Sequence, residues 1–353
     1  MRVIEHSKPT IGQEELEAVA EVIRSGLLAQ GEITRKFEEE LSAFITCSGG
    51  VATSTGTLAL YMALLSIDIQ PGDEIIIPSY VCRSVLNAVQ YCGAKPVLCD
   101  VNLDDYNICF EDAKKKISPK TKAIIIVHMF GSPAEIDKFK ELGLYIIEDC
   151  AHSIGATYKG KKVGSWGDLS IFSFEGTKLI IAGEGGMVLT TSEKLLDRLR
   201  RLKEPDSLDY NTKYVFRMTN IQAAIGRVQL LRLPHFIKRR REIAQQYNSE
   251  FKILDIELPK IPEHGEHIFH RYMIKIKGNI QELMDQCFKK GVKVKQPVKP
   301  YPLHRYLNMD SKDFPNTELI MNSAVSIPIY PLLSDEQLGL ITNVIREHFI
   351  KGI

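Results

Sequence analysis

Short apolar runs alternate with amphipathic stretches along the first part of the chain. Four of these runs, at 74–78, 95–101, 122–131 and 144–150, read EIIIP, KPVLCDV, KAIIIVHMFG and LYIIEDC. The stretches between them have helical length and spacing. Strands that alternate with helices are typical of a parallel sheet with helices on both faces. We therefore predict an α/β fold with a mostly parallel central sheet.

The start of the chain predicts two amphipathic helices, at Gln13–Ser25 and 34–44, separated by a glycine-containing turn. A short strand then ends near Thr53, and the chain turns at Gly56 into an apolar helix. Later, the runs LSIFSF and GMVLTT follow one another without a long helix between them. This spacing indicates a hairpin-like or mixed portion of the same sheet.

The C-terminal part has a different pattern, which predicts a second and smaller α/β domain. Residues 220–251 are helical in pattern, and Pro234 is expected to break them into two segments. A strand in HRYMIKIKG, a helix near 280–290 and a final amphipathic helix from Ser334 follow. We predict a large domain over residues 1–235, including the N-terminal helices, and a small domain over 236–353.

Composition excludes several function classes. The 353 residues carry 45 basic and 44 acidic side chains, a formal net charge of +1. Such a balance gives no general attraction to nucleic acid or to an anionic membrane. The seven cysteines form no CxxC pair, so no disulfide framework, zinc site or other metal site is expected. Without a secretory signal or a membrane span, the chain is expected in the cytoplasm.

Polar residues at the ends of the predicted strands are the candidates for chemistry, because ligands of such sheets bind there. The turn TSTGT at 53–57 combines free backbone amides at a helix start with hydroxyl groups, which suits an anion such as phosphate. Taken alone, the turn is better explained as an ordinary helix cap by Ser54 or Thr55.

Three more residues extend this pattern. Asp149 ends a buried strand, where a carboxylate requires a positive partner. Either a salt bridge or the pyridinium nitrogen of pyridoxal 5'-phosphate (PLP) meets that requirement. Lys178 lies in FSFEGTKLIIAGEGG, and a partly buried amine there is suited to form a Schiff base with an aldehyde. Ser173 offers a hydroxyl five residues earlier. Each signal is weak alone, but their order fits one cofactor across one sheet edge.

Two segments, IEDCAHSIGA and FSFEGTK, carry the most specific resemblance to a known family. Together with TSTGTLAL, GEGGMVLTT and RMTNIQAAIGRVQL, they make the chain similar to the DegT/StrS family of sugar aminotransferases. This family is a branch of the fold-type-I PLP enzymes, and the resemblance covers essentially the whole chain. It implies PLP as cofactor, pyridoxamine phosphate as an intermediate, and a homodimer whose active sites lie at the subunit interface.

The resemblance also implies roles for individual residues. Lys178 matches the lysine that holds PLP as a Schiff base and later moves the proton. Asp149 matches the carboxylate paired with the pyridinium nitrogen, and His152 matches a position beside the ring and its phenolic oxygen. The phosphate-binding positions are matched by Gly56, Thr57 and Ser173.

The chain departs from the family pattern at several positions. Cys82 stands where many members carry an aromatic residue that stacks on the ring, and nearby Tyr80 is not assigned that role. Val215 stands where many members carry an asparagine that reaches the neighbour's phosphate, which leaves Arg217 as the nearest cation. The loop 201–214 lacks the usual glycine-containing stretch. These changes suggest a divergent subgroup.

The resemblance implies transfer of an amino group from glutamate to a nucleotide-linked keto-sugar in a ping-pong reaction. Candidate substrate residues are His304, Arg217 and Glu184. One alternative is a PLP-dependent sugar dehydratase, but those relatives have lost the lysine that Lys178 matches. Another is a regulatory or binding protein that has kept the fold.

Overall fold

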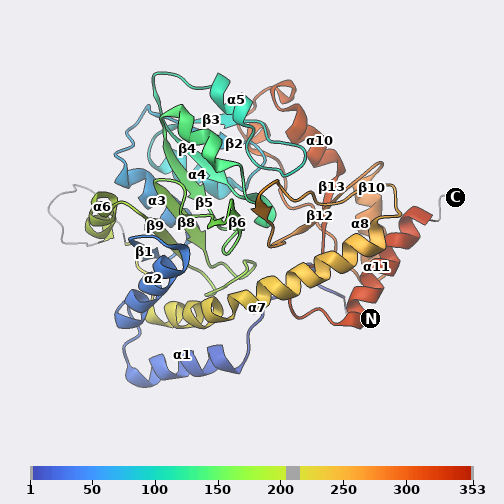
Figure 1. Cartoon of the computed structure of the whole chain (residues 1–353), viewed down its shortest axis with the longest axis horizontal. Coiled ribbons are helices and arrows are strands. Elements are labelled where there is room, and N and C mark those ends of the chain that lie inside the picture. The colour runs from blue at the N-terminus through green and yellow to red at the C-terminus, as the bar shows by residue number, and fades with distance from the viewer. Residues whose placement is uncertain (1–2, 204–214, 351–353) are drawn as a thin grey trace.

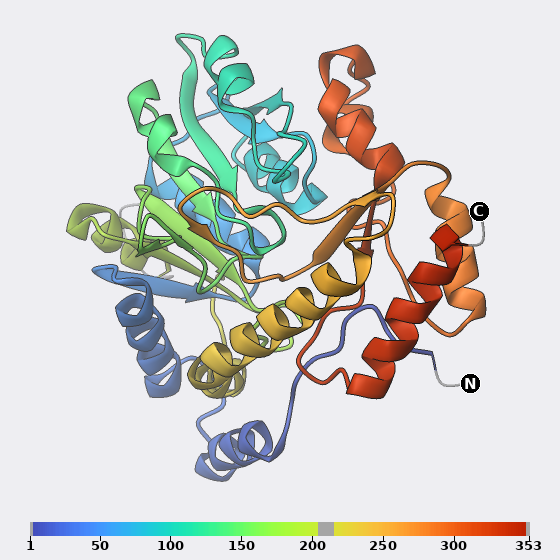
Figure 2. The same cartoon turned by 45° about the vertical axis from the view of Figure 1, so that its right-hand side comes forward.

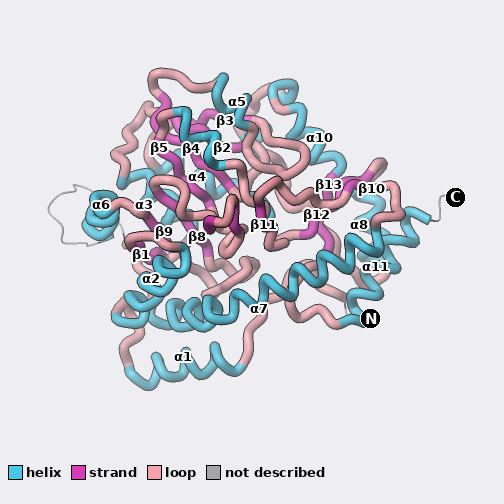
Figure 3. Tube along the Cα trace, in the orientation of Figure 1, coloured by secondary structure: helices cyan, strands magenta, loops and turns pink. Residues whose placement is uncertain are grey.

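A seven-stranded sheet forms the centre of the computed structural model, which describes residues 3–203 and 215–350 (Figures 1 and 3). The strand order is β1 (Gly49–Thr53), β9 (Gly186–Thr190), β8 (Leu169–Ser173), β5 (Tyr145–Asp149), β4 (Thr121–Val127), β2 (Glu74–Pro78) and β3 (Lys95–Cys99). The five strands from β8 to β3 pair in parallel, whereas β9 runs antiparallel to both of its neighbours. The predicted mostly parallel sheet and its mixed portion are both confirmed.

Helices cover both faces of this sheet, because alternate strand residues point to opposite sides. Ile75 and Ile77 join a core with α3 (Gly56–Ser66), α4 (Arg83–Tyr91) and α6 (Glu193–Lys203). Ile76 joins another core, with α5 (Phe110–Lys115) and the 3-10 helix η2 (Ile136–Leu142). The same face is covered beside it by α2 (Glu32–Ile45), and α1 (Gln13–Ser25) packs farther out. The central strands β2, β4 and β5 are therefore buried on both sides over most of their length, which explains their continuous apolar runs.

The helix α7 (Asn220–Phe251) runs as one element from the large sheet to the small C-terminal unit (Figure 1). The predicted break at Pro234 is wrong. A proline inside a helix costs roughly 3 kcal/mol, and one buried apolar side chain contributes roughly 1.5–3 kcal/mol. Burial of apolar side chains on both sides of Pro234 offsets that cost. The buried side chains are those of Leu230, Leu233, Phe236, Ile243, Tyr247 and Phe251.

The small unit is a three-stranded antiparallel sheet with helices against it. Its strands are β10 (Ile256–Glu257), β12 (Tyr272–Ile276) and β13 (Ala324–Ile327), and its helices are α8 (Ile280–Lys289) and α11 (Asp335–Ile350). Figure 2 shows α8 and α11 side by side at the edge where both chain ends lie. Ile4 pairs with Val292 and is buried in this core, so the first described residues pack with the small unit.

Shorter elements connect the two units. A small sheet combines β6 (Thr157–Tyr158), β7 (Lys161–Lys162) and β11 (Gly265–Glu266). The segment with α9 (Leu303–Tyr306), η3 (Ser311–Asp313) and α10 (Pro315–Ser323) returns to the large core, where Leu303 and Phe314 are buried. The 3-10 turn η1 (Met129–Gly131) follows β4. The division predicted at residue 235 falls inside α7, and it stays a prediction.

Two further properties of the described residues bear on the chemistry. None of the helices within 3–203 and 215–350 combines the length and the apolar character needed to cross a bilayer. All seven cysteines are free thiols, and Cys82 is the exposed one. The loop 201–214, which departs from the family pattern in its lack of glycine, lies outside the described residues from position 204 onward.

Candidate active site

A cavity of about 360 Å³ opens where β5 and β8 end and α3 begins. Six of the residues proposed from the sequence to bind cofactor or substrate line it: Gly56, Thr57, Asp149, Ser173, Lys178 and Glu184. They come from three segments of the chain, and parallel strands bring them to one edge of the sheet. The cavity is therefore the place where their chemistry combines.

One end of the cavity is built to receive an anion. Thr55 caps α3: its hydroxyl accepts a hydrogen bond from the Leu58 amide, and its carbonyl accepts one from Ala59. Within the described chain this leaves the amides of Gly56 and Thr57 without a protein acceptor, at the positive end of the helix dipole. A Cβ on Gly56 would lie 2.7 Å from the Ser173 Cβ and 2.9 Å from its Oγ. Glycine therefore lets the Ser173 hydroxyl approach the helix start, an arrangement that suits a phosphate.

Asp149 forms the buried acid of the cavity. It ends β5 with only 5% of its surface exposed, and its Oδ1 accepts a hydrogen bond from the Ala151 amide at 3.0 Å. Burial raises the pKa of its carboxyl, while that hydrogen bond and the charges of Lys178 and His128 act in the opposite direction. Because one hydrogen bond does not offset the cost of burying a charged carboxylate, a positively charged partner would stabilise it. A protonated ring nitrogen, as in PLP, satisfies that need.

Lys178 lies on the loop between β8 and β9, and its position is fixed by bonds within that loop. Its amide donates to the Glu175 carbonyl at 2.9 Å, and the Glu175 carboxylate accepts from the Thr177 amide and hydroxyl. Phe174 and Ala182 bond across the base of the loop at 2.8 Å. The half-buried Lys178 side chain lines the same cavity as Asp149. Amine, acid, hydroxyl and helix start together fit PLP.

His152 lies beside the cavity and is half-buried. Its ring stacks on His270 with a centroid distance of 4.4 Å, and Phe130 lies on a nearly parallel plane at 6.0 Å. Burial lowers its pKa well below the usual range, and the charges of Lys178 and Arg271 act in the same direction. The ring is therefore neutral. Its buried Nδ1 has no partner among the described residues, which leaves one polar atom free for a ligand.

The residues that depart from the family pattern differ in burial and in their distance from the cavity. Cys82 lines the cavity, whereas Tyr80 is fully buried and packs against Tyr106 and Phe130. This agrees with not assigning the stacking role to Tyr80. Val215 is 77% exposed, and Arg217 is exposed two residues later.

The remaining substrate candidates differ in their surroundings. Glu184 lines the cavity and is exposed. His304 is completely buried: its Nδ1 lies 2.7 Å from the Ser79 hydroxyl and its Nε2 lies 2.7 Å from Glu318. Its ring also stacks on Phe314 at 4.6 Å. In the described structure His304 is a packing residue, and a substrate contact would require one of these bonds to break.

Residues of the cavity that were not singled out in the sequence include Ala151, Glu175 and Ser84. The first two lie inside IEDCAHSIGA and FSFEGTK, so the family-like segments did contain a signal for them. Ser84 lies in α4, in the family-like segment PSYVCRS, where the pattern drew attention to Cys82 but not to Ser84.

A buried cluster of His128, Glu148 and Cys150 has side chains of the kinds that bind metals. The Glu148 carboxylate, however, already accepts bonds from the His128 ring and from the amides of Gly164, Trp166 and Gly167. Four donors use its acceptor positions. The cluster is therefore explained as a hydrogen-bond network that holds the loop after β7 against β5.

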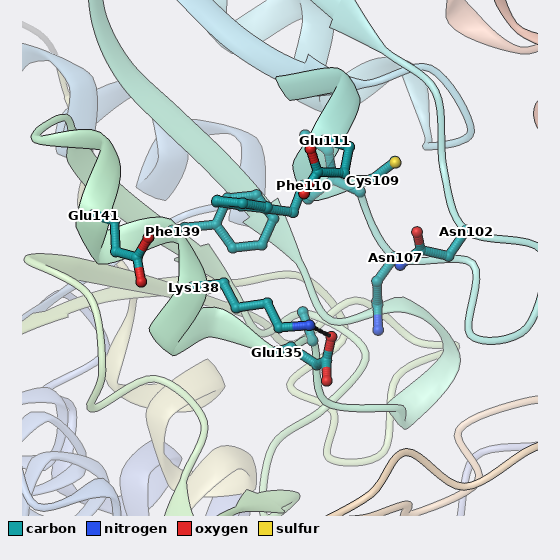
Figure 4. A pocket seen from close by; sticks show the side chains of 11 residues that line it. Asn102, Asn107, Cys109, Phe110, Glu111, Glu135, Lys138, Phe139 and Glu141 are labelled. Carbon is teal, nitrogen blue, oxygen red and sulfur yellow. Dashed lines mark hydrogen bonds and ion pairs between the residues drawn. The ribbon is translucent and has the colours of Figure 1, made fainter. Parts of the chain in front are cut away.

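A separate hollow of about 330 Å³ lies between the 102–111 segment and η2 (Figure 4). Asn107 is on one side, and Glu135 and Lys138 form an ion pair at 2.5 Å on the other. None of the residues singled out in the sequence lines it. Because it lacks the amine, acid and anion site that the Lys178 cavity brings together, this hollow does not compete with it as an active site.

Comparison with known proteins agrees with this geometry. The model of the DegT/DnrJ/EryC1/StrS aminotransferase family matches residues 9–346. The chain is 33% identical to a GDP-perosamine synthase of Vibrio cholerae, over 97% of this chain and 98% of that protein. It is 32% identical to the spore coat polysaccharide biosynthesis protein SpsC of Bacillus subtilis, over 98% and 97%.

Solved structures show the same fold. Spr1654 from Streptococcus pneumoniae, solved in a PMP-form, superposes with a TM-score of 0.93 at 27% identity, over 99% of this chain and 98% of that chain. Its PLP-form gives the same TM-score at 26% identity, over 99% and 100%. The predicted fold-type-I architecture is thus confirmed. The chain belongs to the DegT/DnrJ/EryC1/StrS family of PLP-dependent sugar aminotransferases.

Proposed function

We propose that this aminotransferase moves an amino group from glutamate to a nucleotide-linked keto-sugar in a ping-pong reaction. The observation that carries the proposal is the single cavity that joins Lys178, Asp149 and Ser173 to the start of α3. The named relatives include a GDP-perosamine synthase and a polysaccharide biosynthesis protein, which favours a nucleotide-linked sugar as acceptor. The product would then enter a surface polysaccharide or a related glycan.

Each residue of the cavity has a part in this reaction. PLP, when bound, supplies an electron sink for the carbon that loses its proton. The Lys178 Nζ is the covalent anchor and then the base that takes this proton and returns it. Asp149 holds the ring nitrogen in its protonated form, and His152 is placed beside the ring. The phosphate is held by Gly56, Thr57 and Ser173.

The same proposal includes contacts with the substrates and the setting of the enzyme. Glu184, on the cavity wall, and Arg217 are candidates for contacts with the sugar nucleotide, and His304 is a weaker one. Free thiols are typical of proteins kept in a reducing compartment, which supports a cytoplasmic location.

Two other functions of the same fold are less well supported. A dehydratase of this kind would lack the lysine, whereas Lys178 is present and lines the cavity. A protein that only binds ligands does not require an amine, a buried carboxylate and an anion site in the same cavity. Substitution of Lys178 separates these cases, since binding alone does not depend on the amine.

Glutamate alone should convert the cofactor, because a ping-pong reaction completes its first half without the sugar. We expect the visible absorbance of the PLP-loaded protein to fall when glutamate is added, with release of 2-oxoglutarate. Titration of the absorbance with glutamate checks this. An unchanged spectrum with glutamate, together with a change caused by another amine donor, would show that the donor is wrong.

The proposed homodimer is supported by an apolar hollow of about 370 Å³ between α1, α2 and α7. Leu231 is 81% exposed and Leu27 is 69% exposed, and both line it together with Val22 and Val228. Large apolar side chains gathered around a hollow are typical of an interface with another chain. A second copy of the chain is the partner that the proposed shared active sites require.

The substitution Leu231→Glu should therefore weaken the dimer, because it places a charge in the middle of an apolar contact. We expect the wild type to elute with the mass of two 39.9 kDa chains and the variant to shift toward one, with loss of activity. Light scattering after gel filtration measures both. Phe288→Glu, which changes a 59% exposed residue on α8, is the matched control and should remain dimeric. A wild type that elutes as one chain would contradict the proposal.

A further inference from the structure

Arg271, immediately before β12, is a half-buried cation without a carboxylate partner among the described residues. Its Nη1 donates to the Nδ1 of His6 at 2.9 Å. Across the parts of the chain that the structure describes, no carboxylate lies within ion-pair distance of it. Burial lowers the pKa of Arg271 to about 10, with only the charge of Glu175 acting in the opposite direction. The guanidinium therefore remains charged at neutral pH, although its surroundings do not neutralise it.

His6 positions this guanidinium but does not balance its charge. Burial, together with the charges of Arg271, Lys295 and Lys293, lowers the pKa of His6 to about 2. The ring is neutral, so Nδ1 accepts from Arg271 and the ring proton belongs on Nε2, which lies 2.9 Å from the Ser326 hydroxyl. One of the five N–H donors of Arg271 is used in this way, and it fixes the direction of the side chain.

Neighbouring contacts place Arg271 on the small-unit side of the Lys178 cavity. Its amide donates to the Phe130 carbonyl at 3.2 Å. The preceding residue, His270, stacks on His152 and lies 3.3 Å from the carbonyl of Thr177, the residue before Lys178. Glu175, whose charge reaches Arg271, lines the cavity itself. The charge of Arg271 also reaches His152, so the unbalanced cation lies near two residues beside or in the cavity, His152 and Glu175.

We propose that Arg271 binds a carboxylate of the amino donor, an inference that rests on the proposed function. An amino acid that brings its amine to Lys178 carries a carboxylate on the adjoining carbon, close to the transferred group. A planar guanidinium recognises a carboxylate through two parallel hydrogen bonds. The negative charge of the bound donor would also balance the positive charge of Arg271, for which the described residues provide no carboxylate partner.

The diphosphate of the sugar nucleotide is another anion that an arginine recognises. A carboxylate fits better for two reasons. Arg271 is half-buried and its charge reaches His152 and Glu175, whereas the diphosphate is attached to the sugar away from the carbonyl that receives the amine. Arg217 is exposed and is already the proposed cationic contact for the sugar nucleotide.

Arg271→Met and Arg271→Lys, in the full-length PLP-loaded enzyme, test the inference. Charged hydrogen bonds contribute roughly 1.5–3 kcal/mol, which corresponds to about 10–150-fold in affinity. We expect Arg271→Met to raise the half-saturating glutamate concentration by that factor, and Arg271→Lys by less. Glutarate, a dicarboxylate without an amine, should raise the melting temperature of the wild type but not of Arg271→Met. Lys275→Met is the matched control on the same strand, because its cation is paired with Glu257 instead.

The outcomes separate this inference from the proposed function. Unchanged glutamate saturation in Arg271→Met, or loss of its PLP absorbance before any donor is added, would overturn the role of Arg271. Weaker binding of GDP by the variant, with unchanged response to glutarate, would assign the arginine to the nucleotide and also overturn it. If the wild type reacts with a different amino acid, the proposed donor is wrong, and a lower affinity of Arg271→Met for that amino acid still supports the inference.

Discussion

Lys178→Ala should abolish transamination, with a loss of at least about 10³-fold in turnover. The lysine has two parts in the reaction, as covalent anchor and as proton carrier, and positioned acid–base catalysis alone is worth roughly 10²–10⁴-fold. Because the loop around it is held by bonds of Glu175, Thr177 and Phe174, the substitution should leave the fold intact. Multiple-turnover assays with glutamate and a keto-sugar measure the loss.

Lys178→Arg is the control for this variant. It keeps a positive charge in the cavity but cannot form the covalent bond, so it should be as inactive as Lys178→Ala. Both variants should still bind PLP non-covalently, because the phosphate and ring-nitrogen contacts come from other residues. Activity retained by Lys178→Arg would show that only the charge matters, which contradicts the proposed role.

Asp149→Asn should change activity and stability in opposite directions. Loss of a buried ion pair costs roughly 3–5 kcal/mol, so we expect turnover to fall by at least about 10²-fold. In the cofactor-free protein, burial raises the pKa of the Asp149 carboxyl above its unfolded value. The unfolded chain then releases this proton first as the pH rises, so the stability of the folded protein falls through the window between the two pKa values. The asparagine has no proton to release and avoids this loss.

Thermal melting at several pH values tests both parts. At pH 7 the cofactor-free variant should melt above the wild type, and the difference should vanish below the unfolded pKa of about 3.9. Added PLP should raise the melting temperature of the wild type more than that of the variant. Asp100→Asn is the control: this buried carboxylate accepts three bonds from Asn316 and Thr317, so its loss should destabilise the protein without changing the effect of PLP. Equal PLP effects in wild type and Asp149→Asn would contradict the pairing.

Much of the fold could be predicted from local patterns. The strands of the central sheet are buried on both faces and therefore appear as apolar runs. The start of α1 and its end at Ser25 were read directly from the sequence. The break predicted at Pro234 is wrong because proline is a local signal, whereas the packing of α7 against two units depends on residues far away in the sequence.

The site could be predicted only in part, for a related reason. Asp149 and Lys178 stand at strand ends and in family-like segments, so the sequence marks them. The isolation of Arg271 depends on His6, 265 residues away, and on which carboxylates happen to lie nearby. No local pattern contains such information. The packing of His304 between Ser79 and Phe314 likewise follows from tertiary contacts.

Borohydride reduction of the PLP-loaded protein, followed by peptide mass spectrometry, tests the central claim most directly. The reduction fixes the bond between the cofactor and its lysine, so the modified residue can be identified. The account predicts a visible absorbance band before reduction and one pyridoxyl group on the peptide that contains Lys178. An adduct on a different lysine, or no band even after PLP is added, would contradict the assignment of this cavity as the active site.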